Sequence, residues 1–449
     1  MLVKYFLGVD WGTHSSKWAC SEFDGTQHRY LRIPPIVSSD IEHVGDSFAF
    51  GRELGDADTA TRFLKRVLIQ DPLGPDFWNA ERVDCCSSLG EAVSFSLCCL
   101  LVDALASLNL PLDGPGVELD IAFSLPNWVV NVDRPYKVAT ANFLSSAAVA
   151  AHVALTNPLQ ALPHPGVDFP LQEWKRLVAA ARKGGVAMTQ PAMETLMQTR
   201  YATPVSNVCW GLINESGAAG LPYLRNLEIE TELGSPGVPG LAKLLVIDVG
   251  AGSTDVGYML RVRNRIKGNE CLYILPPAAS FGVAGNHLTE ELVGHLRSQG
   301  QLVGRSDAEA QKIRSWATWQ DLPFAEQWRS QIARQVQAYV QGVPDLLWLL
   351  RAMPLNIVLT GGSGLVPGLA GRIRDAVVEG LRLRGADPQA LVTTTEHSLR
   401  GLALGDMAEY GRRAVCLGAS DSDRPGCKYV AQLDPPAPPR NRAPVRAWV

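Results

Sequence analysis

The stretch LLVIDVGAGSTDVGYM, residues 244–259, decides the expected fold. An apolar run ends in Asp248, a Gly-rich turn follows, and a second apolar run begins after Asp255. Glycine lets the backbone turn tightly and approach an anion, and successive N–H groups in such a turn form a concave anion site. The pattern therefore predicts a β-hairpin whose turn binds phosphate.

A second copy of this pattern lies near the start of the chain, in FLGVDWGTHSSKWA, residues 6–19. Here the first apolar run ends in Asp10, and Gly12 and Thr13 form the turn. Mg²⁺ favours one or two carboxylates together with waters and phosphates, so Asp10 is placed to hold the hydrated ion. Two copies of one hairpin predict two similar lobes, each offering a turn to the same polyphosphate.

A third junction lies in NIVLTGGSGLVPGL, residues 356–369. An apolar strand ends in Gly361, Gly362 and Ser363, and no Gly-Lys-Ser/Thr follows, so this is not a Walker A sequence. Two glycines leave room for a flat ring or a ribose to lie against the backbone. One such turn alone would be an ordinary turn, but three in this order predict a nucleotide site.

The three junctions resemble the phosphate-1, phosphate-2 and adenosine motifs of the actin/Hsp70/sugar-kinase superfamily. The chain looks most like the nucleotide-binding domain of Hsp70 chaperones, because LINESGAAGLPYL (residues 212–224) resembles the helix that precedes phosphate-2 there. FSLPNWV (123–129) and SFGVAGNHLTEEL (280–292) resemble two further turns of that family. The resemblance covers most of residues 5–410. It implies an α/β protein with the actin-like ATPase fold, which is two ribonuclease H-like lobes around a central nucleotide cleft.

The resemblance also implies ATP or ADP and Mg²⁺ as ligands, with water attacking the terminal phosphate. Asp10 and Asp255 would position the metal ion or its waters, and Glu215 would lie close to the attacking water. The implied catalytic residues are Asp10, Glu215, Asp248, Ser253 and Asp255. The implied nucleotide contacts are Gly12, Thr13, His14, Gly250, Ala251, Gly252, Ser253, Gly285, Glu309, Lys312, Gly361, Gly362 and Ser363. For Glu309 and Lys312 a solvated helix face is an equal alternative, and for His14 a solvent-facing turn is the stronger one.

The chain departs from the Hsp70 pattern at a lysine. Hsp70 proteins carry a lysine that reaches the γ-phosphate, whereas the corresponding residues 70–83 contain none. Lys65 lies nearby and is a weaker candidate for that role. Ala251 replaces a glycine, and His14 stands where a small hydroxyl residue is usual. We therefore expect binding and leave the rate of hydrolysis open.

The expected organisation is lobe I over residues 1–230, with an inserted helical segment near 143–205, and lobe II over 241–410. A C-terminal extension, residues 411–449, follows, in which the regular pattern fades and the Pro/Arg-rich end is expected to be disordered. So short a segment has no room for the peptide-binding domain of an Hsp70 chaperone. The resemblance thus implies a stand-alone ATPase domain.

Composition argues against several other classes. A formal net charge of -4 gives no basic surface for nucleic acid. The apolar segments 96–108 and 143–155 are short and contain Asp103 and His152, so we expect buried helices rather than membrane spans. Ser88 and Glu91 form a capping box that opens the first of these helices. Nine cysteines without a CxxC pair argue against zinc and, with no visible signal peptide, favour the cytoplasm.

The leading hypothesis is therefore an ATP-driven, chaperone-like switch that acts on a protein partner, either co-chaperone-like or client-delivering. Three alternatives stay open. The chain can be a nucleotide-binding scaffold with little turnover, an actin-like filament protein, or a small-molecule kinase of the same superfamily.

Overall fold

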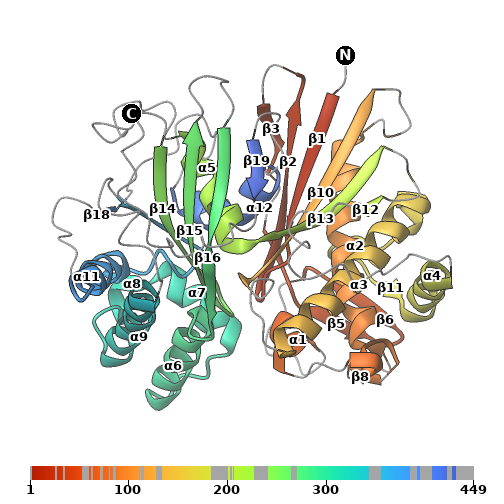
Figure 1. Ribbon diagram of the computed structural model, residues 1–449. Helices are drawn as coiled ribbons and strands as arrows, with labels where there is room; N and C mark the ends of the chain where they lie inside the picture. Colours follow the sequence, from red (N-terminus) through yellow and green to blue (C-terminus); the bar gives the residue numbers. More distant parts are fainter. Residues whose placement is uncertain are drawn as a thin grey trace.

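The computed structural model describes most of the chain. The described residues are 3–25, 28–33, 36–52, 60–61, 64–70, 74–79, 81–83, 87–110, 112, 116–127, 134–183, 201–202, 205, 207–226, 241–263, 270–342, 355–384, 392–394, 407–421 and 427–430. They form a mixed α/β protein with two large sheets side by side, a four-stranded sheet and a two-stranded ribbon (Figure 1). The segment 184–200 and the expected disordered tail, 431–449, lie outside the described residues.

The N-terminal sheet grows from the first predicted hairpin. Its strands are β1 (Val3–Asp10), β2 (Ser15–Phe23), β3 (His28–Arg32), β4 (Val37–Ser38), β10 (Val117–Leu125), β12 (Tyr201–Ala202) and β13 (Val208–Asn214). β1, β2 and β3 pair antiparallel, while β10 and then β13 continue the sheet in parallel from the other edge of β1. The predicted hairpin is confirmed, with Asp10 at the end of β1.

The C-terminal sheet repeats this connectivity. Its strands are β14 (Leu241–Val249), β15 (Thr254–Arg263), β16 (Glu270–Phe281), β17 (Leu355–Thr360), β18 (Val392–Thr394) and β19 (Cys427–Val430). Its order β16-β15-β14-β17-β18 matches β3-β2-β1-β10-β13, with antiparallel pairs on one side of the first strand and parallel pairs on the other. Asp10 and Asp248 therefore lie at equivalent strand ends. Asp10 is the last residue of β1, and Asp248 is the last but one of β14.

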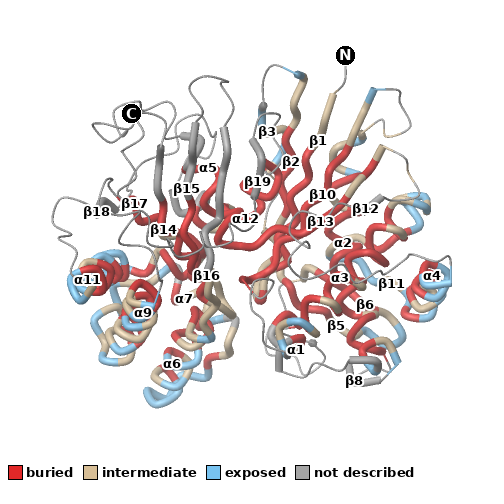
Figure 2. Tube along the Cα trace, in the orientation of Figure 1, coloured by how far each residue is buried: buried red, intermediate tan, exposed pale blue. Residues whose placement is uncertain are grey.

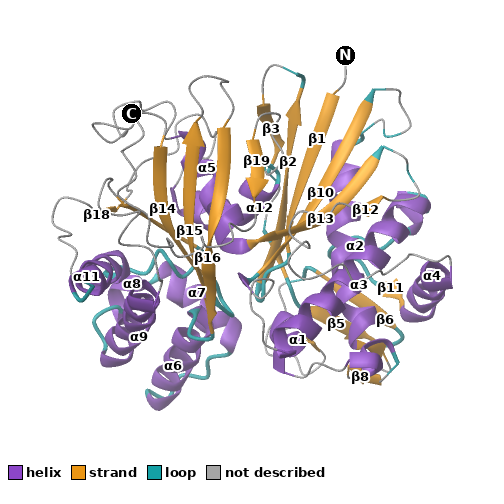
Figure 3. Cartoon of the chain, in the orientation of Figure 1, coloured by secondary structure: helices purple, strands orange, loops and turns teal. Residues whose placement is uncertain are grey.

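Each sheet carries its own helices and hydrophobic core (Figures 1 and 3). Helices of the N-terminal part are α1 (Leu64–Gln70), α2 (Leu89–Leu108), α3 (Arg134–Thr156) and α4 (Leu171–Lys183). Helices of the C-terminal part are α6 (Gly285–Ser298), α7 (Arg305–Arg314), α8 (Trp316–Trp319), α9 (Pro323–Gly342) and α11 (Leu369–Arg382). The four-stranded sheet contains β11 (Phe169–Pro170), β6 (Ser47–Phe50), β5 (Ile41–Val44) and β7 (Ala60–Thr61), and the ribbon contains β8 (Glu81–Val83) and β9 (Ser87–Ser88).

Two long apolar helices lie in the N-terminal core. The capping box of Ser88 and Glu91 is present at the start of α2, as predicted. The segments Leu89–Leu108 and Pro135–Thr156 are long and apolar enough to cross a membrane, and most of each is buried inside the molecule (Figure 2). Within this structure their apolar surface is covered by the protein itself.

Two further helices, α5 (Glu215–Asn226) and α12 (Met407–Ala419), lie between the sheets and share a third core with residues of both (Figure 1). A Cβ atom added to Gly418 would lie 1.6 Å from the carbonyl oxygen of Ala218, so the two helices meet backbone to backbone. The expectation that regular structure fades after Gly411 is wrong. Here α12 continues past that glycine, and β19 then pairs with β16.

Candidate functional site

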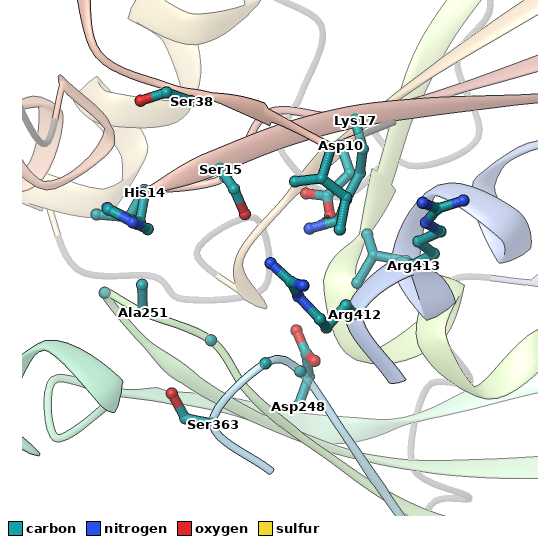
Figure 4. Close-up of a pocket in the computed structure, with 18 of the residues that line it drawn as sticks. Asp10, His14, Ser15, Lys17, Ser38, Asp248, Ala251, Ser363, Arg412 and Arg413 are labelled. Carbon is teal, nitrogen blue, oxygen red and sulfur yellow. Dashed lines mark ion pairs between the residues drawn. The ribbon is translucent and has the colours of Figure 1, made fainter. Parts of the chain in front are cut away.

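A cavity of about 510 Å³ opens where the ends of the two sheets approach each other. The turns after β1 and β14 line it, together with the turn after β17 and parts of α1, α5, α7 and α12 (Figure 4). All the predicted site residues line this cavity except Asp255, Gly285 and Lys312. Ser15, a hydroxyl of the first turn that can donate to phosphate, also lines it. The lining residues that we did not predict are Lys17, Ile36, Val37, Ser38, Asp40, Ala310, Arg314, Gly411, Arg412, Arg413 and Val415.

The two hairpin turns touch each other across the cavity. A Cβ atom on Gly252 would lie 2.3 Å from Oγ1 of Thr13, so any side chain there would push the turns apart. Within the first turn, a Cβ atom on Gly12 would lie 2.1 Å from the carbonyl oxygen of Ser15. At both positions a side chain would clash with neighbouring atoms, so glycine is required there, as the turn pattern predicted.

The third turn packs against the end of β14. Gly361 has a φ of +84°, and a Cβ atom there would lie 2.3 Å from the carbonyl oxygen of Val249. The N–H of Ser363 donates to that same carbonyl at 3.1 Å, and the N–H of Gly361 donates to Gly411 at 2.9 Å. The turn is thereby held between the C-terminal sheet and α12.

Asp10 is paired with a cation that the sequence reasoning missed. Nζ of Lys17 lies 2.7 Å from Oδ2 of Asp10, and Oγ of Ser124 donates to Oδ1 at 3.1 Å. Burial would lower the pKa of Lys17, but the adjacent Asp10 outweighs it and raises that pKa. Asp10 and Lys17 are direct cross-strand partners in the hairpin, so the predicted turn already implied their contact.

Asp248 faces the cavity from the other sheet. Its Oδ1 accepts a hydrogen bond from Oγ1 of Thr360 at 2.8 Å. Burial, followed by the nearby Asp255 carboxylate, raises the pKa of Asp248 to about 7. Arg412 extends from α12 into the space between Asp248 and Asp10 (Figure 4). This brings a positive group from a third element to the two acids.

Asp255 is fully buried and does not line the cavity. Its Oδ1 accepts the backbone N–H of Asn127 at 2.7 Å, and its Oδ2 accepts Oγ of Ser253 at 2.7 Å. Burial raises the pKa of Asp255 in spite of these two donors. Asp255 is therefore linked to the cavity through the hydroxyl of Ser253.

Glu215, the first residue of α5, forms a buried ion pair with Lys65 of α1. Both side chains line the cavity, so the structure brings together the predicted glutamate and the lysine that was the weaker candidate. Burial raises the pKa of Glu215 well above its usual value, since the attraction of Lys65 does not fully offset the loss of water. The sequence alone could not pair two residues so far apart in the chain.

Glu309 and Lys312 of α7 form a bonded cluster with α6. Nζ of Lys312 lies 2.7 Å from Oε1 of Glu309 and donates to Oγ1 of Thr289 at 3.0 Å. Burial raises the pKa of Glu309, but Lys312 and His14 outweigh it and lower that pKa. Lys312 is buried, so the solvated helix face is wrong for it, and only Glu309 lines the cavity.

Gly285 begins α6 underneath the cavity rather than in its wall. A Cβ atom on Gly285 would lie 1.9 Å from Oγ of Ser363 and 3.0 Å from the carbonyl oxygen of Gly250. The N–H of Gly285 donates to Gly250, and that of Asn286 donates to Ala251. Gly285 therefore packs two of the turns together, which is a structural role close to the site.

Neither a cluster of metal ligands within the described part of the chain nor a similar known protein identifies the ligand of this cavity. Among the residues that the structure describes, no three His, Cys, Asp or Glu side chains lie close enough to hold a metal ion by themselves. No model of a known protein family matches the chain, and no curated protein matches its sequence.

Proposed function

We propose that the chain binds ATP between two lobes of an actin-like ATPase fold, similar to the nucleotide-binding domain of Hsp70 chaperones. The observation that carries the proposal is the repeated sheet. Two sheets of the same connectivity each end in an Asp-x-Gly turn, and the two turns meet at Thr13 and Gly252. We assign lobe I to the N-terminal sheet and its helices, and lobe II to the C-terminal sheet and its helices.

The cavity suits a polyphosphate and a nucleoside. Its volume lies within the range of small-molecule sites. Lys17, Lys65 and Arg412 line it beside the turn amides, and these donors would bond phosphate oxygens. Lys17 and Lys65 are also paired with Asp10 and Glu215, so a bound Mg²⁺ would add to the charge that a triphosphate requires. The Gly361–Gly362 turn and Glu309 also line it, and they would contact the adenosine.

The acids that face the cavity fit a hydrated Mg²⁺ ion, because this ion needs only one or two carboxylates beside phosphates and waters. Asp10 and Asp248 would hold it, one from each lobe. Asp255 is buried behind Ser253, so we replace our expectation of Asp255 as a metal residue by a role in orienting that hydroxyl. The ion would neutralise charge on the phosphates.

Hydrolysis would depend on Glu215 and Lys65. Burial raises the pKa of Glu215, which makes its carboxylate a stronger base and suits a group that accepts a proton from water. Lys65 places an ammonium group beside it, where it can balance charge that develops on the terminal phosphate. This lysine at the site favours turnover over the scaffold without hydrolysis.

The close crossing of α5 and α12 supports a switch in which nucleotide changes the angle between the lobes. A protein partner of the co-chaperone-like or client-delivering kind would read that change. The filament and the kinase remain the competing functions.

The test is ATP turnover with Mg²⁺ by the purified protein, beside Lys65→Met and Asp10→Ala. We expect slow release of phosphate that both variants lower by at least about 10-fold. Sedimentation with ATP would reveal a filament, and release of ADP only when a sugar is added would identify a kinase. A folded protein that neither binds nor cleaves ATP would refute the proposal.

A further inference from the structure

Asn127 follows β10 in the turn of FSLPNWV, and the proposed mechanism has not used it. The residue is almost fully buried. It makes three hydrogen bonds to lobe II. Its backbone N–H donates to Oδ1 of Asp255 at 2.7 Å, and its Nδ2 donates to the carbonyl oxygens of Val256 at 3.1 Å and Ala279 at 2.9 Å. One side chain of lobe I thereby bonds both β15 and β16.

The remaining atom of the same amide bonds lobe I. Oδ1 of Asn127 accepts hydrogen bonds from Nδ2 of Asn214 at 2.9 Å and from Oγ of Ser216 at 3.0 Å. These two donors are the chain neighbours of Glu215. Asn214 also caps α5, because its Oδ1 accepts the N–H of Gly217 at 3.2 Å. The residues before and after Glu215 in the chain are therefore both hydrogen-bonded to Asn127.

The surroundings leave little freedom for this group of bonds. A Cβ atom on Gly257 would lie 2.6 Å from Oγ of Ser216, so α5 and β15 are in direct contact beside Asn127. Every hydrogen-bonding atom of the Asn127 amide is used, two N–H groups toward lobe II and one oxygen toward lobe I. If the lobes separate at this point, these buried groups lose their partners, and each group that stays buried without a new partner costs stability.

We infer that Asn127 is a positioning residue that clasps the two lobes and holds Glu215 and Asp255 in the arrangement that hydrolysis requires. The inference rests on the proposed function for its catalytic part only. The clasp itself exists whether or not ATP is the ligand. Asn127 does not line the cavity, so it acts through its neighbours rather than on the nucleotide.

The experiment compares Asn127→Ala with a matched variant, Asn142→Ala. Asn142 is also buried in lobe I, on α3, and its Nδ2 has no hydrogen-bond partner among the described residues. Hydrogen exchange is measured by mass spectrometry without nucleotide. We expect faster exchange in segments 208–218, 254–262 and 278–281 of Asn127→Ala, and wild-type exchange there in Asn142→Ala. Unchanged exchange in those segments would overturn the clasp.

The second measurement separates positioning from simple loss of stability. We expect Asn127→Ala to lower kcat for ATP by roughly 10- to 100-fold while KM and the Kd for ADP change less than about 3-fold. A kcat equal to that of wild type would overturn the catalytic part. If Asn127→Ala does not fold, Ser216→Ala removes one bond of the clasp, and a smaller change in the same segments and in kcat is expected. A folded wild-type protein that neither binds nor cleaves ATP would refute the proposed function, while the exchange result would still decide the clasp.

Discussion

The contact between the two turns gives the sharpest prediction, the effect of Gly252→Ala. The new Cβ atom would lie 2.3 Å from Oγ1 and 2.9 Å from Cβ of Thr13, whereas ordinary contact begins near 3.4 Å. Rotation of the Thr13 side chain can move Oγ1 but not Cβ, so the turns must separate by about 0.5 Å. Misplacing reacting groups by about 1 Å costs on the order of 100-fold in rate. For about half that displacement we expect kcat/KM for ATP to fall by about 10-fold.

The assay is phosphate release at several ATP concentrations, with the free energy of unfolding measured in urea. Gly294→Ala is the matched control, because nothing lies within 4 Å of a Cβ atom there and alanine favours the helix by about 1 kcal/mol. We expect this control to keep full turnover. If Gly252→Ala hydrolyses ATP as fast as wild type, the two turns do not act on one nucleotide and the reasoning fails.

Three further predictions follow from burial and contact. The pKa of Asp248 is about 7 in the folded protein, above its ordinary value of 3.8. The protonated carboxyl therefore stabilises the folded state at low pH, and this stability is lost as the pH rises from about 4 through 7. The unfolding free energy should fall by an amount on the order of 4 kcal/mol over that range. Urea unfolding at pH 5 and pH 8 should show a smaller loss in Asp248→Asn than in wild type, and equal losses would contradict the assignment. Lys65→Met leaves Glu215 buried without its cation and should lower the unfolding free energy by about 3 kcal/mol. The double variant Lys65→Met/Glu215→Gln should regain most of that stability, and a double variant as unstable as the single one would argue against the ion pair. Gly418→Ala should lower the unfolding free energy by about 2 kcal/mol, because the new Cβ atom would clash with the carbonyl oxygen of Ala218. A melting temperature equal to that of wild type would contradict this and show that the contact between α5 and α12 can relax.

Local patterns predicted the hairpins and their glycines correctly, because each turn is decided by neighbours in sequence. Asp10 is the last residue of β1 and Asp248 is the last but one of β14. In the turns that follow, Gly12 and Gly252 have no room for a side chain. The same reasoning placed Glu215 at the start of a helix. These features need no information about distant parts of the chain.

Features that depend on distant contacts were missed. The sequence of α12 contains Gly411 and Gly418, which are weak helix formers, and the helix exists because it is packed between two sheets. Its cation Arg412 was therefore not foreseen in the cavity. Asp255 looked like a metal residue beside its turn, but a bond from Asn127 in the other sheet's connection holds it below the surface of the cavity.

We propose that one nucleotide lies between the two Asp-x-Gly turns. The most direct test is calorimetric titration of the folded protein with ATP and Mg²⁺. The same titration is made with Gly12→Ala, in the turn after β1, and with Gly361→Ala, in the turn after β17 that packs against the end of β14. We expect one ATP per chain, with binding weakened in both variants. A folded wild-type protein that takes up no ATP, or two variants that bind it as tightly as wild type, would contradict the account.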